Sequence, residues 1–173
     1  MPKMSLTQVL VICEILNKFV FAKIRDQGLA YAVNVQVDEK ADEIAILVHD
    51  SVLILNALSA IRDAVQDLNQ FILNEKMLEI VKRSVYLKQM QKCQNSYDKY
   101  ISEFIESTYH KVFDKNVLQN ITIQSVIVDL NQFSGQYLNN SNLNIIVMMP
   151  KSTALQKMST LKAFVTYGFK LFM

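Results

Sequence analysis

The sequence predicts an α+β domain in which helices pack on one face of a mostly antiparallel sheet. Three observations support this fold class. Strand-like runs occur only near the two ends of the chain, and helix-like periodicity fills the middle. Glycine (3 residues) and proline (2 residues) are scarce, so the chain has few of the residues that build tight turns. At 173 residues the chain fits one domain, residues 1–173, which is long enough to bury a core.

The first half of the chain contains helical and strand periodicity in turn. Apolar residues near the N-terminus recur at helical spacing and cover more than one face, which predicts a largely buried helix. Two short apolar runs then flank a polar connection, and together they predict a β-hairpin. The expected elements are a helix capped by Ser5 and reaching Ile24, strands at 29–37 and 44–48, and an amphipathic helix that Asp50 or Ser51 caps and that reaches position 72.

The second half is helical until close to the C-terminus. Residues 145–149 are apolar on both faces, as a strand in the middle of a covered sheet is, and Pro150 ends this run. The predicted order is α–β–β–α–α–α–α–β–α–β. A sheet of this kind usually opens on a strand, so a chain that opens on a helix looks truncated at its N-terminus. The remaining expected elements are a helix after the break at Asn74, a helix that carries Tyr97, a helix capped by Thr122, a short helix at 155–165 and a last apolar segment at 169–173.

Charge and composition exclude several classes of protein. The formal net charge is +2 and basic residues are interleaved with acidic ones, whereas nucleic-acid binding needs a basic stripe. No window reaches the ~20 uninterrupted apolar residues that span a bilayer. We therefore expect no nucleic-acid partner, no membrane association and an intracellular location, cytoplasmic or alternatively mitochondrial. Cys13 and Cys93 lie far apart in helix-like patterns, which predicts small buried side chains rather than a disulfide framework or a zinc site.

Motifs for catalysis and metal binding are missing from the sequence. His49 and His110 each stand without a second histidine or a carboxylate at ligand spacing, and H-x-x-E-H and its inverse are absent. We interpret His49 as a polar residue at a strand end and His110 as one on an exposed helix face. Three glycines leave no glycine-rich phosphate loop. The chain alone is expected to hold no catalytic residue, no metal and no cofactor.

One corner of the sequence carries a candidate binding function. Arg25 ends the first helix, Gly28 turns the chain and Tyr31 opens the first strand. In a purely structural interpretation, Arg25 meets the negative end of the helix dipole and Gly28 supplies a left-handed residue. Lysine at position 25 and phenylalanine at position 31 would serve that purpose equally well. In the functional interpretation, Arg25 and Tyr31 face a substrate.

The stretch around this corner resembles a signature of a known enzyme family. Residues 16–35, LNKFVFAKIRDQGLAYAVNV, are similar to the C-terminal half of M16 zinc metallopeptidases, the pitrilysin/insulinase-type clan, and within it to the presequence-protease-like branch. The shared pattern is a leucine-rich helix, an Ile-Arg pair, a variable turn, Gly-Leu-Ala-Tyr and a strand. Its specific part covers only about ten residues, although the order of elements agrees over most of the chain.

The resemblance implies a clamshell of four α+β modules. The N-terminal half carries zinc on H-x-x-E-H and a downstream glutamate, and the C-terminal half, without metal ligands, closes the chamber over an unfolded peptide. This chain would be the last, non-zinc-binding module, of the M16/LuxS-like metallohydrolase type and without its first strand. By position, Arg25 and Tyr31 would bind substrate and donate to the carbonyl oxygen as it becomes an oxyanion, with Gly28 in the turn. Asp26-Gln27 departs from the small, often glycine-containing turn of close relatives.

Two functions follow from this resemblance. In the first, the chain is a C-terminal, non-catalytic domain or fragment of an M16-type zinc metallopeptidase. Its partners are then a peptide substrate and a zinc-bearing N-terminal half, on the same chain or as a separate subunit. The alternative is a stand-alone inactive subunit that serves as a binding partner or structural scaffold. In both cases the chain is inactive alone, and zinc belongs to the N-terminal half.

Overall fold

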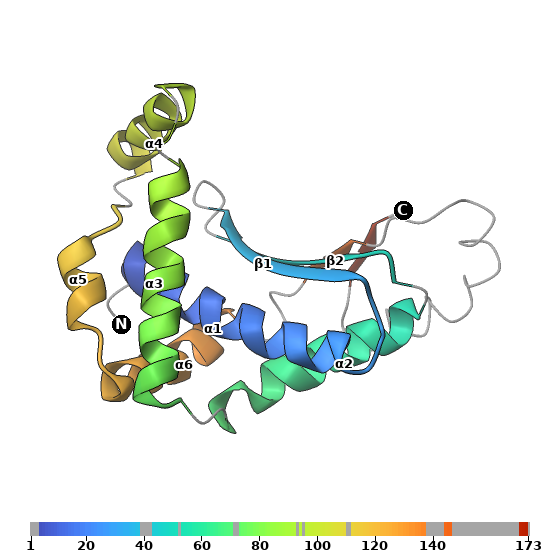
Figure 1. Cartoon of the computed structure of the whole chain (residues 1–173). Helices are drawn as coiled ribbons and strands as arrows, with labels where there is room; N and C mark the ends of the chain where they lie inside the picture. Colours follow the sequence, from blue (N-terminus) through green and yellow to red (C-terminus); the bar gives the residue numbers. More distant parts are fainter. Residues whose placement is uncertain are drawn as a thin grey trace. The chain divides into compact units, whose positions relative to one another are not determined.

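A helix of twenty residues, α1 (Leu6–Arg25), is the central element of the computed structural model shown in Figure 1. The structure describes residues 4–38, 43–51, 53–70, 73–92, 94, 96–109, 112–137, 144–146 and 170–172. The helix begins where the sequence predicts it, because Ser5 and Gln8 form a capping box. The Ser5 Oγ accepts from the Gln8 backbone N–H at 3.3 Å, and the Gln8 side chain accepts from the Ser5 backbone N–H at 3.0 Å.

Helix α1 is buried on several faces, as its sequence predicts. Its most extensive contacts are with the first strand and with α2 (Ile54–Gln66), α3 (Glu75–Lys92) and α5 (Lys115–Asn120). This environment accounts for its apolar residues, which are spread around the helix instead of forming one stripe. Its most buried apolar side chains are Val11, Ile12, Ile15, Leu16, Val20 and Ile24.

The predicted hairpin is present beside α1. It consists of β1 (Ala32–Asp38) and β2 (Glu43–His49), which pair antiparallel with Val35 opposite Ile46. Val33 and Val35 are buried, whereas the β2 residues between the strand ends are half-buried. The Asn17 side chain of α1 accepts a hydrogen bond from the Val35 backbone N–H at 2.9 Å and so fixes the strand against the helix.

Helices make up most of the remaining described chain. The helix α4 (Ser96–Tyr109) projects in Figure 1, and this agrees with its contacts, since α3 is its main neighbour in the described structure. The elements after the hairpin are α2 (Ile54–Gln66), the 3-10 turn η1 (Asp67–Gln70), α3 (Glu75–Lys92), α4 (Ser96–Tyr109), α5 (Lys115–Asn120) and α6 (Ile123–Tyr137).

The chain divides into two compact units, residues 1–131 and 132–173, with the boundary inside α6. The first unit holds the hairpin and the helices before α6. In the second, β3 (Asn144–Ile146) and β4 (Lys170–Phe172) pair in parallel as a separate two-stranded sheet. The predicted short helix at 155–165 lies outside the described residues.

The predicted fold class, an α+β module built on a mostly antiparallel sheet, is wrong. The described chain is mostly helical, and its antiparallel pairing is the single hairpin β1–β2. Among the described residues of the two hairpin strands, only Val33 and Val35 are buried, so helices supply nearly all of the described core. The physical reason is that periodicity predicts the type of an element but not its partner. The run at 145–149 was expected inside one large sheet, yet β3 pairs with β4 alone among the described strands.

Individual element boundaries were predicted with mixed success. Thr122 caps α6 as expected, since its Oγ1 accepts from the Ser125 backbone N–H at 3.2 Å. The expected cap of α2 at Asp50 or Ser51 is wrong, because α2 begins at Ile54 without a side-chain cap. The Ser51 hydroxyl donates instead to the Leu29 carbonyl at 2.8 Å. The short helix α5, capped by Asp114, was not predicted.

None of the helices in the described part of the chain combines the length and the apolar composition that crossing a membrane requires.

Candidate functional site

The candidate site is the corner between α1 and β1, and a glycine-dependent turn builds it. After α1 ends at Arg25, the Gly28 N–H donates to the Arg25 carbonyl and the Leu29 N–H to the Ile24 carbonyl, both at 3.0 Å. This double bonding pattern ends a helix when a left-handed residue follows it. Gly28 supplies that conformation at φ 63°, which a side chain would disfavour. The turn directs the chain back toward β1 with a fixed geometry.

Arg25 is held over this turn by three contacts. Its Nη1 donates to the Tyr31 backbone carbonyl at 2.8 Å. Its guanidinium carbon also lies 5.6 Å from the centre of the Tyr31 ring and 5.8 Å from that of Phe21. Aromatic faces attract a guanidinium at these distances, so the two rings orient the Arg25 fork. The structure therefore places Arg25 and Tyr31 side by side.

The corner is open to solvent. Tyr31 is 72% exposed and Phe21 46% exposed, although both are large aromatic residues. Among the described residues no carboxylate pairs with Arg25, whose contacts use one donor of its five. The guanidinium fork and the Tyr31 hydroxyl can therefore both donate to an incoming oxygen. Carboxylates and peptide carbonyls are the ligands that such a pair of donors suits.

The strand begins later than its alternation predicted, and this changes the environment of Tyr31. Residues 29–37 were expected to form the strand, with Tyr31 on the same face as Val33. The structure starts β1 at Ala32, and Val33 is buried while Tyr31 is exposed. A tyrosine in that position has lost the packing that a strand aromatic normally gains. Whether Arg25 and Tyr31 bind substrate stays a prediction.

Phe21 is the contact that sequence reasoning missed. It stands four residues before Arg25 on α1, and residues with this spacing are neighbours on a helix surface. An aromatic residue followed by arginine at this spacing was the available signal. Phe21 is exposed and therefore contributes to the corner and not to the core. This exposure could not be predicted from the sequence, because α1 is apolar on several faces.

The histidines and cysteines add no site in the described structure. His49 lies exposed at the end of β2, as predicted, whereas His110 and Cys93 lie outside the described residues. Cys13 is buried, also as predicted. Burial and the nearby charge of Glu14 raise the pKa of the Cys13 thiol to about 12, so it stays protonated and is a poor nucleophile or metal ligand. The described residues contain no group of three His, Cys, Asp or Glu side chains placed to hold a metal.

A buried carboxylate joins α1 to α3. Glu14, only 6% exposed, accepts from the Ser84 hydroxyl at 2.8 Å and pairs with the Lys88 Nζ at 2.6 Å. The Lys18 Nζ lies 3.5 Å from the same carboxylate. A buried charge is tolerated when ion pairs and hydrogen bonds replace its water, and Glu14 has both. The cluster therefore stabilises the packing of α1 on α3.

A second buried carboxylate joins α1 to α6. The Gln8 Nε2 donates to both oxygens of Asp129, at 3.0 and 3.1 Å. Burial raises the pKa of the Asp129 carboxyl above its ordinary value, and the hydrogen bond from Gln8 only partly opposes this effect. The amide also connects this contact to the N-terminal cap, because its oxygen accepts from Ser5.

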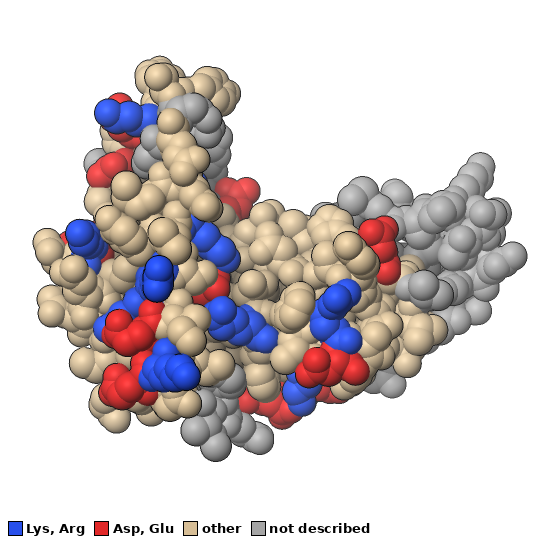
Figure 2. All heavy atoms as spheres, in the orientation of Figure 1, with Lys and Arg blue, Asp and Glu red and all other residues tan. Residues whose placement is uncertain are grey.

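Charges of both signs are interleaved on the surface. Figure 2 shows Lys and Arg side chains lying among Asp and Glu side chains over the face that it draws.

Comparisons of the chain with protein-family models, with curated proteins and with solved structures find no match. The site is therefore interpreted from its own geometry and from the resemblance of residues 16–35.

Proposed function

We propose that the chain is a non-catalytic, peptide-binding component of an M16-type zinc metallopeptidase and that Arg25 and Tyr31 contact the peptide near its scissile bond. The proposal is based on the open corner between α1 and β1. There, two exposed aromatic rings orient the Arg25 guanidinium, which uses one of its five donors and has no carboxylate partner among the described residues. The proposal rests on this corner and not on the large sheet, which the structure contradicts.

The chemistry assigned to the corner is electrostatic. During peptide hydrolysis the scissile carbonyl oxygen gains negative charge, and donors already fixed near it stabilise the transition state more than the ground state. Arg25 provides a planar fork and Tyr31 a hydroxyl. The hydrogen bond from Nη1 to the Tyr31 carbonyl keeps the fork from having to reorganise during the reaction. Zinc and the general base would come from the separate N-terminal half.

The experiment combines this chain with a zinc-bearing N-terminal M16 half and measures hydrolysis of a fluorogenic peptide. We expect Arg25→Lys and Tyr31→Phe each to lower turnover by ~10²-fold, because removing one donor to an oxyanion has an effect of that size. Lysine cannot reproduce the fork, so even this conservative change is expected to reduce turnover.

Matched controls come from the same chain. Arg62→Lys changes another exposed arginine, on α2, and Tyr97→Phe changes a tyrosine on α4 that is 73% exposed, close to the exposure of Tyr31. Both controls should leave turnover unchanged. Full turnover in the Arg25 and Tyr31 variants would contradict the proposal and would show that the corner has a purely structural role.

A further inference from the structure

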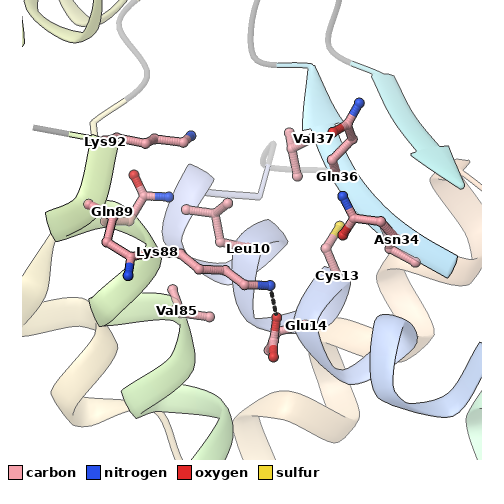
Figure 3. A pocket seen from close by; sticks show the side chains of 12 residues that line it. Leu10, Cys13, Glu14, Asn34, Gln36, Val37, Val85, Lys88, Gln89 and Lys92 are labelled. Atoms are coloured by element: carbon pink, nitrogen blue, oxygen red, sulfur yellow. Dashed lines mark hydrogen bonds and ion pairs between the residues drawn. The ribbon is translucent and has the colours of Figure 1, made fainter. Parts of the chain in front are cut away.

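Helix α3 carries apolar side chains on two opposite faces. Its inner face packs on α1 and holds three buried residues, Leu78, Val81 and Val85. Figure 3 shows Lys88 on this inner side, reaching from α3 to Glu14 of α1. Three other large apolar side chains of α3 are instead about half exposed: Ile80 (50%), Leu87 (49%) and Met90 (52%). At 3.6 residues per turn, these three point about 170° away from the buried set.

Two cations lie in line with the exposed apolar residues. They complete one stripe along α3, here called the outward stripe: Lys76, Ile80, Arg83, Leu87 and Met90. The steps along this stripe are alternately four and three residues. One helix presents its seam to another with this spacing in a coiled coil. Contiguous exposed apolar side chains are typical of a surface that another molecule covers.

The two cations of the stripe have no partner in the described structure. Among the described residues, neither Lys76 nor Arg83 forms a hydrogen bond or an ion pair, and both are exposed. The other basic residues of α3 already have partners: Lys82, Lys88 and Lys92. Within the described chain, Lys76 and Arg83 are therefore the positive charges of α3 that can meet a ligand.

Acidic residues close to the stripe do not cancel this charge. Glu79 already pairs with a lysine at 3.1 Å. Glu75 lies in the first turn of α3, where the positive end of the helix dipole stabilises it, about 100° around the helix from the centre of the stripe. The neighbouring α5 begins with one charge of each sign, Asp114 at its cap and Lys115. Helix α4 meets the C-terminal end of α3 in Figure 1, whereas Arg83 lies nine residues before that end.

The chemistry of the stripe favours a helix as its partner. The backbone groups of α3 bond within the helix, so the stripe offers side chains only and cannot pair with an extended strand. A helix satisfies its own backbone and repeats its side chains at the same spacing. Lys76 and Arg83 lie seven residues apart, about 10 Å along the axis, so two carboxylates seven residues apart on a partner helix can meet both. An anionic membrane suits the stripe less well, because Glu79 lies beside it and the inner face of α3 is buried.

This sequence does not supply such a partner helix itself. It contains no Asp or Glu after Asp129. Its only two acidic residues spaced seven apart are Glu43 and Asp50, and the residues from Glu43 to His49 form strand β2. A symmetric pair of copies would set two positively charged stripes against each other, and like charges at close range repel. The complement of the stripe is therefore to be sought on another protein.

We propose that the outward stripe of α3 binds an amphipathic, acidic helix of another protein. Apolar side chains of that helix pack on Ile80, Leu87 and Met90, and its carboxylates pair with Lys76 and Arg83. Association covers the half-exposed apolar residues and gives both cations a partner. The stripe contains neither of the corner residues assigned to substrate, so this inference goes beyond the proposed function.

The test uses the full chain and a fluorescein-labelled, stapled helical peptide whose heptads carry leucine at a and glutamate at d, with binding followed by fluorescence anisotropy. A second peptide has lysine in place of glutamate, and we expect it to bind at least ~10-fold more weakly. Arg83→Glu should weaken binding of the glutamate peptide by about 10-fold or more and strengthen binding of the lysine peptide, because the charge that faces the peptide is reversed. Ile80→Ser should weaken binding of the glutamate peptide by about 10-fold through lost apolar contact.

Matched controls distinguish the stripe from the rest of the surface. Arg62→Glu on α2 changes the net charge by the same amount, and Ile127→Ser changes an isoleucine on α6 that is 44% exposed; both should leave binding unchanged. Equal affinity of the two peptides, absence of binding by both, or equal losses in Arg83→Glu and Arg62→Glu would overturn the assignment. A dimer in sedimentation velocity that Ile80→Ser abolishes would assign the stripe to a second copy, and binding to phosphatidylserine vesicles that Arg83→Glu abolishes would assign it to a membrane. Either result would also overturn the proposal.

Discussion

The Glu14 cluster predicts a large stability loss from a nearly isosteric change. Glu14→Gln keeps the size of the side chain but removes the charge that pairs with Lys88. The carboxylate is 6% exposed, whereas the Lys88 side chain is 50% exposed and can regain water when its partner is lost. The loss should therefore lie between that of an exposed ion pair and that of a fully buried one. We expect about 2 kcal/mol, the value of a hydrogen bond to a charged group.

The assay is urea unfolding at neutral pH, followed by circular dichroism. A double-mutant cycle with Lys88→Gln separates the pairwise interaction from other effects of each change, and we expect a coupling of about 1–2 kcal/mol. The control is Glu79→Gln on α3, because Glu79 also pairs with a lysine, Lys82, at 3.1 Å but is 68% exposed. Its cost should stay below about 0.5 kcal/mol. Equal losses in Glu14→Gln and Glu79→Gln would refute the reasoning that burial makes the first pair valuable.

Three further predictions concern pH, the turn and zinc. Because burial raises the pKa of the Asp129 carboxyl in the folded state, this group keeps its proton to a higher pH in the folded chain than in the unfolded chain. Its contribution therefore makes stability fall as pH rises through the folded pKa. Asp129→Asn should remove this fall, and urea unfolding from pH 4 to 7 measures it; an unchanged slope would contradict it. Gly28→Ala should cost about 1 kcal/mol in the same assay, through backbone strain alone, since a Cβ there meets no atom within 4 Å; no loss would count against the left-handed turn. Elemental analysis of the purified chain should find no stoichiometric zinc, and one tightly held zinc per chain would disprove this.

The elements of this fold could be predicted better than their assembly. Capping residues such as Ser5 and Thr122 act within a few positions of the helix start, so the sequence contains the whole signal. The partner of a strand depends on contacts between distant residues, and the continuous apolar run near Ile145 contains no information about which strand it meets. The expected large sheet failed for this reason.

In the candidate site too, local features could be predicted from the sequence, whereas contacts between distant residues could not. Arg25, Gly28 and Tyr31 lie within one turn, so their proximity could be anticipated from sequence, and the left-handed glycine was predicted correctly. The exposure of Tyr31 could not, because it depends on where β1 begins. Glu14 is a charged residue inside an apolar helix, and its burial was not predicted. Its partner Lys88 is 74 residues away, and only the packing of α1 on α3 identifies it.

The most direct test of the role of Arg25 and Tyr31 is the affinity of the assembled enzyme for a peptide phosphonate, whose tetrahedral oxygens imitate the oxyanion. If the corner stabilises the transition state, Arg25→Lys and Tyr31→Phe weaken phosphonate binding by about the same factor as they lower kcat/KM, ~10²-fold, and barely change the affinity for a substrate peptide. Unchanged phosphonate affinity in both variants, or an equal loss for phosphonate and substrate peptide, would contradict this role.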